Sequence, residues 1–99
     1  MIVRWSPLAI DRVVQIGEWI ASERPTAAIR IVDGLFDAVE RLATLPLRWR
    51  RVPEFDERTD LREIFFEQFR IIYKVTDTHI EILTVRHMLQ LMDPNDITE

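Results

Sequence analysis

The residues of this chain that could carry out acid–base chemistry gather near its last predicted strand. His87 follows Arg86 directly, and Arg70 belongs to the strand before it. A histidine beside guanidinium groups is pushed toward its neutral form, which suits a general base, and the arginines could hold a phosphate. This is the outline of a metal-independent ribonuclease, but no Tyr or Lys follows the strand to serve as the general acid. We therefore favour a structural or partner-facing role for His87.

Two further groups of residues suit binding to a partner rather than catalysis. The first is an arginine–aromatic run in a predicted loop, made of Arg48, Trp49, Arg50 and Arg51. Such a run suits an acidic partner, unless the acidic residues that follow it neutralise its charge. The second is an apolar run after the last predicted strand, made of Met88, Leu89, Leu91 and Met92. We interpret this run as an exposed patch for a partner, because the predicted helices already cover the sheet.

Two arginines also lie on consecutive predicted strands with apolar neighbours, Arg62 and Arg70. The simpler interpretation is that they pair across strands with Glu63, Glu67 or Glu81. The alternative is that they line a polar groove for a target.

Composition excludes several classes of site. The chain has no cysteine, which removes disulfides, thiolate zinc sites and cysteine nucleophiles. Its two histidines, His79 and His87, lie eight residues apart with a predicted strand between them, and no glycine-rich phosphate loop is present. We therefore expect neither a metal nor a cofactor.

Charge and hydropathy narrow the class of protein further. The net charge of −4, from 13 basic and 17 acidic residues, argues against general nucleic-acid binding. No uncharged run approaches the ~18 residues that a membrane span needs. The first residues lack the basic start and apolar run of a signal peptide, so we expect a cytoplasmic protein with no membrane contact.

Two helices are predicted in the first half of the chain. Ser6-Pro7 is typical of a helix start, and apolar residues then recur at helical spacing as far as Ile20. The pattern breaks before Pro25, where a second helix begins, and this helix is predicted to end at Leu45.

Four strands are predicted, at Ile2–Trp5, Leu61–Phe66, Phe69–Val75 and Ile80–His87. Residues 46–60 show no period and contain two prolines, so they are expected to form a long loop, which is a common place for function. The last strand is expected to alternate strictly, with one face made of Ile80, Ile82, Thr84 and Arg86.

These elements predict an α+β fold, in which an N-terminal helical hairpin packs on an antiparallel β-sheet of about four strands. The N-terminal strand is expected to join an edge of the sheet. One domain spans residues 1–99 and ends in an acidic tail at about 93–99. Gly34, inside the second helix, is expected to mark the close approach of another backbone.

The order and spacing of these segments resemble the ParE/RelE superfamily of bacterial toxins. The most specific pieces are LRE at 61–63, FRIIYKV at 69–75 and ILTVRH at 82–87. The resemblance covers about residues 2–92. It implies a toxin of a type II toxin–antitoxin (plasmid stabilisation) module, in a heteromeric complex with a cognate antitoxin, ParD-like or other, that wraps and neutralises it.

Two activities occur in that superfamily, and the resemblance is closer to ParE. ParE-like members poison DNA gyrase, whereas RelE-like members cut mRNA in the ribosomal A site. The acidic net charge, the single lysine and the long hairpin favour the ParE branch. We therefore expect a protein that inhibits gyrase by binding it, without chemistry of its own and without binding DNA alone.

The resemblance also points to site residues. If the chain is ParE-like, the residues expected to face a partner are Arg48, Trp49, Arg50, Arg51, Arg86, Met88, Leu89, Leu91 and Met92. For the alternative, a RelE-type ribosome-dependent mRNA endonuclease, the catalytic residues are Arg62, Arg70, Arg86 and His87, with Glu54 as a base. A third reading is a decayed toxin that only binds its antitoxin.

Overall fold

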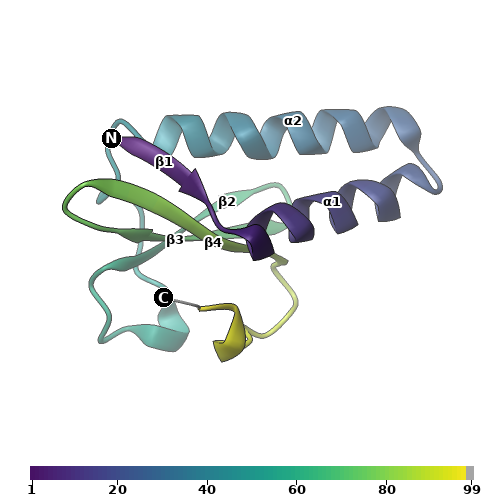
Figure 1. Cartoon of the computed structure of the whole chain (residues 1–99). Coiled ribbons are helices and arrows are strands. Elements are labelled where there is room, and N and C mark those ends of the chain that lie inside the picture. Colours follow the sequence, from purple (N-terminus) through teal and green to yellow (C-terminus); the bar gives the residue numbers. More distant parts are fainter. Residues whose placement is uncertain (98–99) are drawn as a thin grey trace.

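The structure is a computed structural model, and it describes residues 1–97. Two helices, α1 (Pro7–Ala21) and α2 (Pro25–Leu42), form a hairpin that covers one face of a sheet (Figure 1). The strands of that sheet lie in the order β1-β4-β3-β2. Their bounds are Ile2–Trp5 for β1, Leu61–Phe66 for β2, Phe69–Val75 for β3 and His79–His87 for β4. The predicted α+β fold with an N-terminal helical hairpin is confirmed.

The sheet is mixed rather than wholly antiparallel. β2 pairs with β3 and β3 with β4 in antiparallel fashion, as tight connections require. β1 joins the edge of the sheet as expected, but it runs parallel to β4, with Ile2 beside His79 and Trp5 beside Ile82. No tight turn links these two strands, because α1, α2, β2 and β3 lie between them in the chain, so nothing local imposes an antiparallel direction.

The start of α1 is tied to the sheet by one side chain. The Ser6 hydroxyl accepts a hydrogen bond from the Ala9 backbone N–H at 3.0 Å, which is the predicted N-cap. The same hydroxyl donates to the Leu83 carbonyl on β4 at 2.9 Å. α2 ends at Leu42, three residues earlier than predicted, and residues 43–60 then form the long loop.

The main core lies between the hairpin and the sheet. Both helices contribute their predicted apolar stripes, with Ala9 and Val13 from α1 meeting Ile31, Leu35 and residues of all three long strands. Gly34 is a point of close approach, although its neighbour is a side chain and not a backbone. A Cβ atom at this position would collide with the ring of Phe66 on β2.

A β-bulge in β4 decides which residues face the helices. Thr84 pairs with Ile72 and Ile82 pairs with Tyr73, so Leu83 is the extra residue between them. The predicted strict alternation is therefore wrong beyond Ile82. Leu83 and Thr84 both point away from the helices, Val85 returns to the main core, and Arg86 points away again.

The face of the sheet opposite the helices, here called the far face, is covered by the chain itself. The turns η1 (Pro53–Phe55) and η2 (Pro94–Asp96) lie on this side (Figure 1). A second, smaller core forms beneath them, made of Val52, Leu61, Ile72, Leu83 and Met92 with Phe55 and Ile97. Within the predicted acidic tail at 93–99, residues 94–96 form η2 and Asp96 is buried, while residues 98–99 lie outside the described part.

Candidate functional site

Arg70 lies at the centre of a cluster of charged side chains on the far face. Its guanidinium donates to Glu63 Oε1 from Nε at 2.9 Å and from Nη2 at 2.6 Å. Two further hydrogen bonds, each of 2.8 Å, reach the two carboxylate oxygens of Glu54. Glu63, whose side chain is wholly buried, also accepts a hydrogen bond from Arg50 Nε. The Arg70–Glu63 pairing considered in the sequence analysis is therefore present.

The ion pair with Arg70 in this cluster makes Glu54 a weaker base. The hydrogen bonds from Arg70 lower the pKa of Glu54 from 4.5 to about 2, against the opposing effect of burial. The same contacts, led by the hydrogen bond to Glu54, raise the pKa of Arg70. A carboxylate held in a bidentate ion pair is a weak proton acceptor at neutral pH.

Arg86, beside Arg70 on the neighbouring strand, is bound by a different carboxylate. Its Nη1 donates to Asp96 Oδ2 at 2.9 Å, and the Thr84 hydroxyl donates to the same oxygen at 3.0 Å. Arg12 of α1 donates to the other oxygen at 3.1 Å. Burial raises the pKa of Asp96, but the hydrogen bonds from Arg86, Thr84 and Arg12 outweigh it and leave the pKa below its usual range.

His87 lies on the helix-covered face of β4, opposite to Arg70, although His87 and its neighbour Arg86 line one cleft beside α1. Its ring packs edge-on against Phe69 with ring centres 5.7 Å apart. The Leu89 backbone N–H donates to its Nδ1 at 3.1 Å, so this ring nitrogen already serves as an acceptor within the chain. Arg62, which pairs with Tyr73, lies on this face too and donates to the Trp49 and Thr59 carbonyls.

The structure therefore divides the residues named for a ribonuclease between two faces of the sheet. Arg70, Arg86 and Glu54 lie on the far face in ion pairs within the chain, whereas Arg62 and His87 lie on the other. Cleavage of a phosphodiester requires a base, an acid and a cationic group around one point, and these five residues, all within the described part of the chain, are not gathered in that way.

The arginines of the loop before β2 differ in the contacts they make. Arg50 binds Glu63 and lies over the Phe65 ring, 5.0 Å from its centre. Arg51 donates to the Asp56 carbonyl, and Arg48 lies over the ring of Trp49, which packs against the main core. Within residues 1–97, Arg48 and Arg51 form no ion pair, so their charges remain available to a partner.

The C-terminal apolar run is partly exposed and partly core. Leu89 and Leu91 are 86% and 85% exposed, and Met88 is also exposed. Met92 is only 8% exposed and belongs to the far-face core, so its assignment to the exposed patch is wrong. The apolar patch of this chain therefore consists of Met88, Leu89 and Leu91.

Three residues with notable contacts or exposure in the structure were not among the site residues predicted from the sequence. Asp96 and Arg12 are far apart in the sequence, and no local pattern predicts that they meet at Arg86. Trp19 occupies a solvent-facing position of α1. The signal available for it was a large aromatic residue outside the helix's apolar stripe.

The described residues contain neither a candidate metal cluster nor a helix suited to span a membrane. No three or more of the His, Asp and Glu side chains in residues 1–97 are placed to hold a metal ion together. No helix within residues 1–97 is both long and apolar enough to cross a membrane.

Comparison with known sequences identifies relatives of the chain. A family model for the ParE toxin of the type II toxin–antitoxin system parDE matches residues 3–92. The curated protein "Putative toxin Y4kP" of Sinorhizobium fredii is 34% identical over 90 residues, which cover 89% of this chain and 88% of that protein.

Comparison with solved structures shows the same fold. A chain of the chromosomal ParDE TA system from P. aeruginosa superposes with a TM-score of 0.75 at 20% identity, over 88% of this chain and 95% of that one. A chain of the toxin–antitoxin complex RelBE2 from Mycobacterium tuberculosis gives 0.53 at 19% identity, over 87% and 95%. At these identities the likeness concerns the fold, two N-terminal helices on a four-stranded, mostly antiparallel sheet.

Proposed function

The chain belongs to the ParE toxin family of type II toxin–antitoxin systems, and from this membership we propose that it acts in the cytoplasm by binding and poisoning DNA gyrase. A cognate antitoxin neutralises it in a heteromeric complex. The two structural relatives come from a ParDE system and a toxin–antitoxin complex, which supports an antitoxin partner.

One observation carries the choice of a binding toxin over a nuclease. The far-face arginines, Arg70 and Arg86, are both bound by carboxylates of their own chain. Binding an RNA phosphate would require breaking these ion pairs, which would take from the buried Glu63 and Asp96 one cationic partner each and is costly. His87 is turned to the opposite face with Nδ1 occupied.

Two exposed surfaces are suited to contact the target. The apolar patch of Met88, Leu89 and Leu91 has the exposure and composition of a protein-binding surface. Arg48 and Arg51 in the loop add positive charge that is not paired within residues 1–97. We assign the patch to gyrase, with the loop arginines as further contacts.

The proposal is tested by supercoiling of relaxed plasmid by gyrase in the presence of the purified chain. We expect loss of supercoiling, accumulation of cleaved DNA trapped on gyrase, and reversal of both by the antitoxin. The double variant Leu89→Ser/Leu91→Ser should inhibit at least tenfold less. Ile29→Ser, at an exposed apolar position of α2, is the matched control and should inhibit as the wild-type chain does.

A cell-free translation assay separates the nuclease alternative. If the folded chain leaves gyrase untouched but causes cleavage of ribosome-bound mRNA, the gyrase proposal is wrong and a RelE-type activity is present. If the chain affects neither gyrase nor translation but binds its antitoxin, it is a decayed toxin that only binds the antitoxin.

A further inference from the structure

The apolar patch is carried by a β-turn that follows the end of β4. The His87 carbonyl accepts a hydrogen bond from the Gln90 backbone N–H at 3.0 Å, which makes these two residues the first and last of the turn, here called the His87 turn. Met88 and Leu89 take its two central positions, and Leu91 follows it. Leu89 and Leu91 are more exposed than any other large apolar side chain in residues 1–97.

The His87 turn lacks the residues that usually form a turn. Turns favour Gly, Pro, Asn, Asp and Ser, because these residues fit the backbone angles or bond to the nearby backbone. Residues 87–92 have the sequence HMLQLM, which contains none of them. Exposed apolar side chains at the centre of a turn add little to the stability of the fold, so a contact outside the chain is the simplest reason for their presence.

Two side chains of the turn supply hydrogen bonds that hold its backbone. His87 Nδ1 accepts a hydrogen bond from the Leu89 backbone N–H at 3.1 Å, which is the contact that an Asn side chain makes in an Asx-turn. Gln90 Oε1 accepts a hydrogen bond from the His87 backbone N–H, also at 3.1 Å. Both side chains therefore bind the backbone of the turn, while the side chains of Met88 and Leu89 remain exposed.

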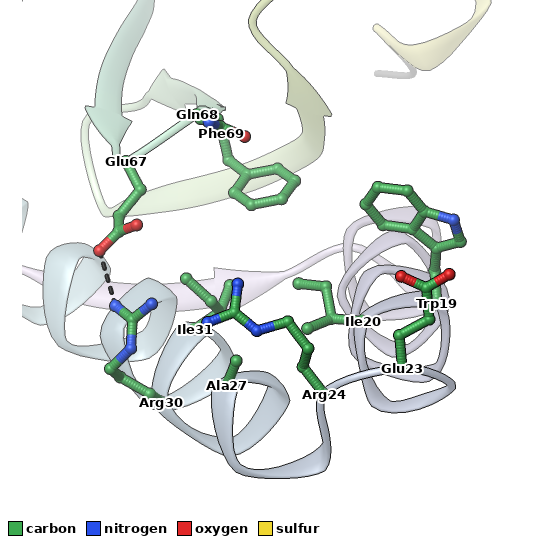
Figure 2. A pocket seen from close by; sticks show the side chains of 10 residues that line it. All are labelled: Trp19, Ile20, Glu23, Arg24, Ala27, Arg30, Ile31, Glu67, Gln68 and Phe69. Atoms are coloured by element: carbon green, nitrogen blue, oxygen red, sulfur yellow. Dashed lines mark hydrogen bonds and ion pairs between the residues drawn. The ribbon is translucent and has the colours of Figure 1, made fainter.

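The base of the His87 turn is held by the β2–β3 connection. The Met88 backbone N–H donates to the Gln68 carbonyl at 2.7 Å, and the Phe69 ring packs edge-on against the ring of the turn's histidine. The residue before Gln68 in this connection, Glu67, binds Arg30 of α2 at 2.7 Å (Figure 2). These contacts fix the turn on the sheet and the hairpin in the free chain.

From these contacts we propose that His87 and Gln90 are positioning residues, which hold the turn in the shape that presents Leu89 and Leu91 to DNA gyrase. This inference rests on the gyrase target proposed above and adds the residues that prepare the patch for it. A surface ordered in advance binds more tightly, because the cost of ordering it is not paid on binding. If the turn is loosened, the apparent affinity falls with the fraction of molecules that hold the binding shape.

The test compares two substitutions that separate the hydrogen bond of His87 from its packing. His87→Leu keeps an apolar side chain against Phe69 but removes the acceptor, whereas His87→Asn keeps an acceptor for the Leu89 N–H and loses the ring. The thermal unfolding midpoint should therefore be lower in His87→Asn. Gyrase inhibition should follow the opposite order, because the concentration for half-inhibition should rise at least fivefold in His87→Leu and stay within about twofold in His87→Asn.

Gln90 and the second histidine provide the matched comparisons. Gln90→Met removes the acceptor for the His87 N–H and should weaken inhibition, whereas Gln90→Glu keeps an acceptor and should restore it. His79→Leu is the control, because His79 begins β4 at the end away from the turn, and it should inhibit as the wild-type chain does. Exchange of the Leu89 amide hydrogen, followed by NMR, should be faster in His87→Leu than in the wild-type chain.

The possible results separate this proposal from the gyrase proposal. Wild-type inhibition by His87→Leu overturns the positioning role, and so does an equal loss in His87→Leu and His87→Asn, because the ring itself would then be needed. A change of oligomeric state in Leu89→Ser/Leu91→Ser, seen by sedimentation, also overturns it, since the turn would then serve a second copy of the chain. Failure of the gyrase proposal is visible in the wild-type chain alone, which would leave gyrase active, and the role in presenting the patch to gyrase would fail with it.

Discussion

Arg70 and Arg86 are direct neighbours across β3 and β4, and both point to the far face. Like charges opposite each other on adjacent strands repel, so the pair requires negative partners. Glu54 and Glu63 supply them for Arg70, and Asp96 supplies one for Arg86. At the residue scale, these acids hold both arginines in ion pairs within the chain.

Removing Arg70 should destabilise the fold because it deprives the buried Glu63 carboxylate of its main partner. We expect Arg70→Met to lower the free energy of unfolding by about 3 kcal/mol. Arg50→Met is the matched control, since Arg50 binds the same carboxylate but is largely exposed, and it should cost less than about 1 kcal/mol. Urea unfolding measures both, and equal losses would contradict this account.

Glu54 should make stability depend on pH in the acid range. Its pKa falls from 4.5 in the free side chain to about 2 in the folded chain, so the unfolded chain binds this proton more tightly. The contribution of Glu54 is therefore fully present above about pH 4.5 and is lost as the pH falls toward 2.

The comparison is between the wild-type chain and Glu54→Gln, unfolded in urea at several pH values from 5 to 2. The free energy of unfolding should fall less steeply with decreasing pH in the variant. Asp60 and Asp96, whose pKa values are also lowered, titrate in both proteins and cancel. Parallel curves would show that Glu54 gains nothing from Arg70.

At the scale of elements, the bulge in β4 and the packing of α2 on β2 position the candidate sites. The bulge turns Thr84 and Arg86 to the far face, where Asp96 meets them, and returns Val85 to the main core. α2 approaches β2 closely at Gly34, where the Phe66 ring fills the space a side chain would take.

Gly34→Ala tests the close contact between α2 and β2, and the substitution has two opposing effects on stability. Alanine favours a helix over glycine by about 1 kcal/mol, whereas a collision in a packed core costs about 1–3 kcal/mol. Because the added Cβ atom would meet the ring itself, we expect a net loss of stability. Phe66→Leu should relieve the collision, so a double-mutant cycle should give a favourable coupling of at least about 0.5 kcal/mol. Additive effects would contradict the contact.

At the scale of the whole molecule, the sheet lies between two covers, the hairpin and the chain's own loop and C-terminal segment (Figure 1). Asp96 connects the C-terminal segment to β4 and α1, because it accepts hydrogen bonds from Arg86, Thr84 and Arg12. Removing the chain after His87 would take away Met92 and Asp96 along with the exposed patch. A truncation therefore tests folding as well as target binding, and substitutions of Leu89 and Leu91 are the cleaner test.

Asp96→Ala should loosen the packing of residues 88–97 on the far face of the sheet. Three hydrogen-bonding side chains lose their shared acceptor, and two of them are arginines, so we expect a loss of about 3 kcal/mol. Amide hydrogen exchange should speed up most in residues 88–97. Asp77→Ala, in an exposed turn, is the control and should leave both measurements unchanged. Uniformly faster exchange throughout the chain would contradict a local release.

The elements and the fold class can be read from the amino-acid sequence because they depend on short-range patterns. Ser6-Pro7 predicts the start of α1, and the apolar period predicts both helices and the long strands. Their order, with the spacing of the LRE, FRIIYKV and ILTVRH segments, also leads to the toxin family.

What only the tertiary structure decides concerns contacts between distant residues. The parallel direction of β1, the bulge at Leu83 and the meeting of Asp96 with Arg12 and Arg86 have no local signature. The same is true of Met92, which a sequence pattern cannot place inside or outside, and of Trp19, which lines one cleft with Ile31 of α2 and Phe69 of β3. Side-chain periodicity specifies a face within one element, whereas burial and ion pairing depend on which other element covers that face.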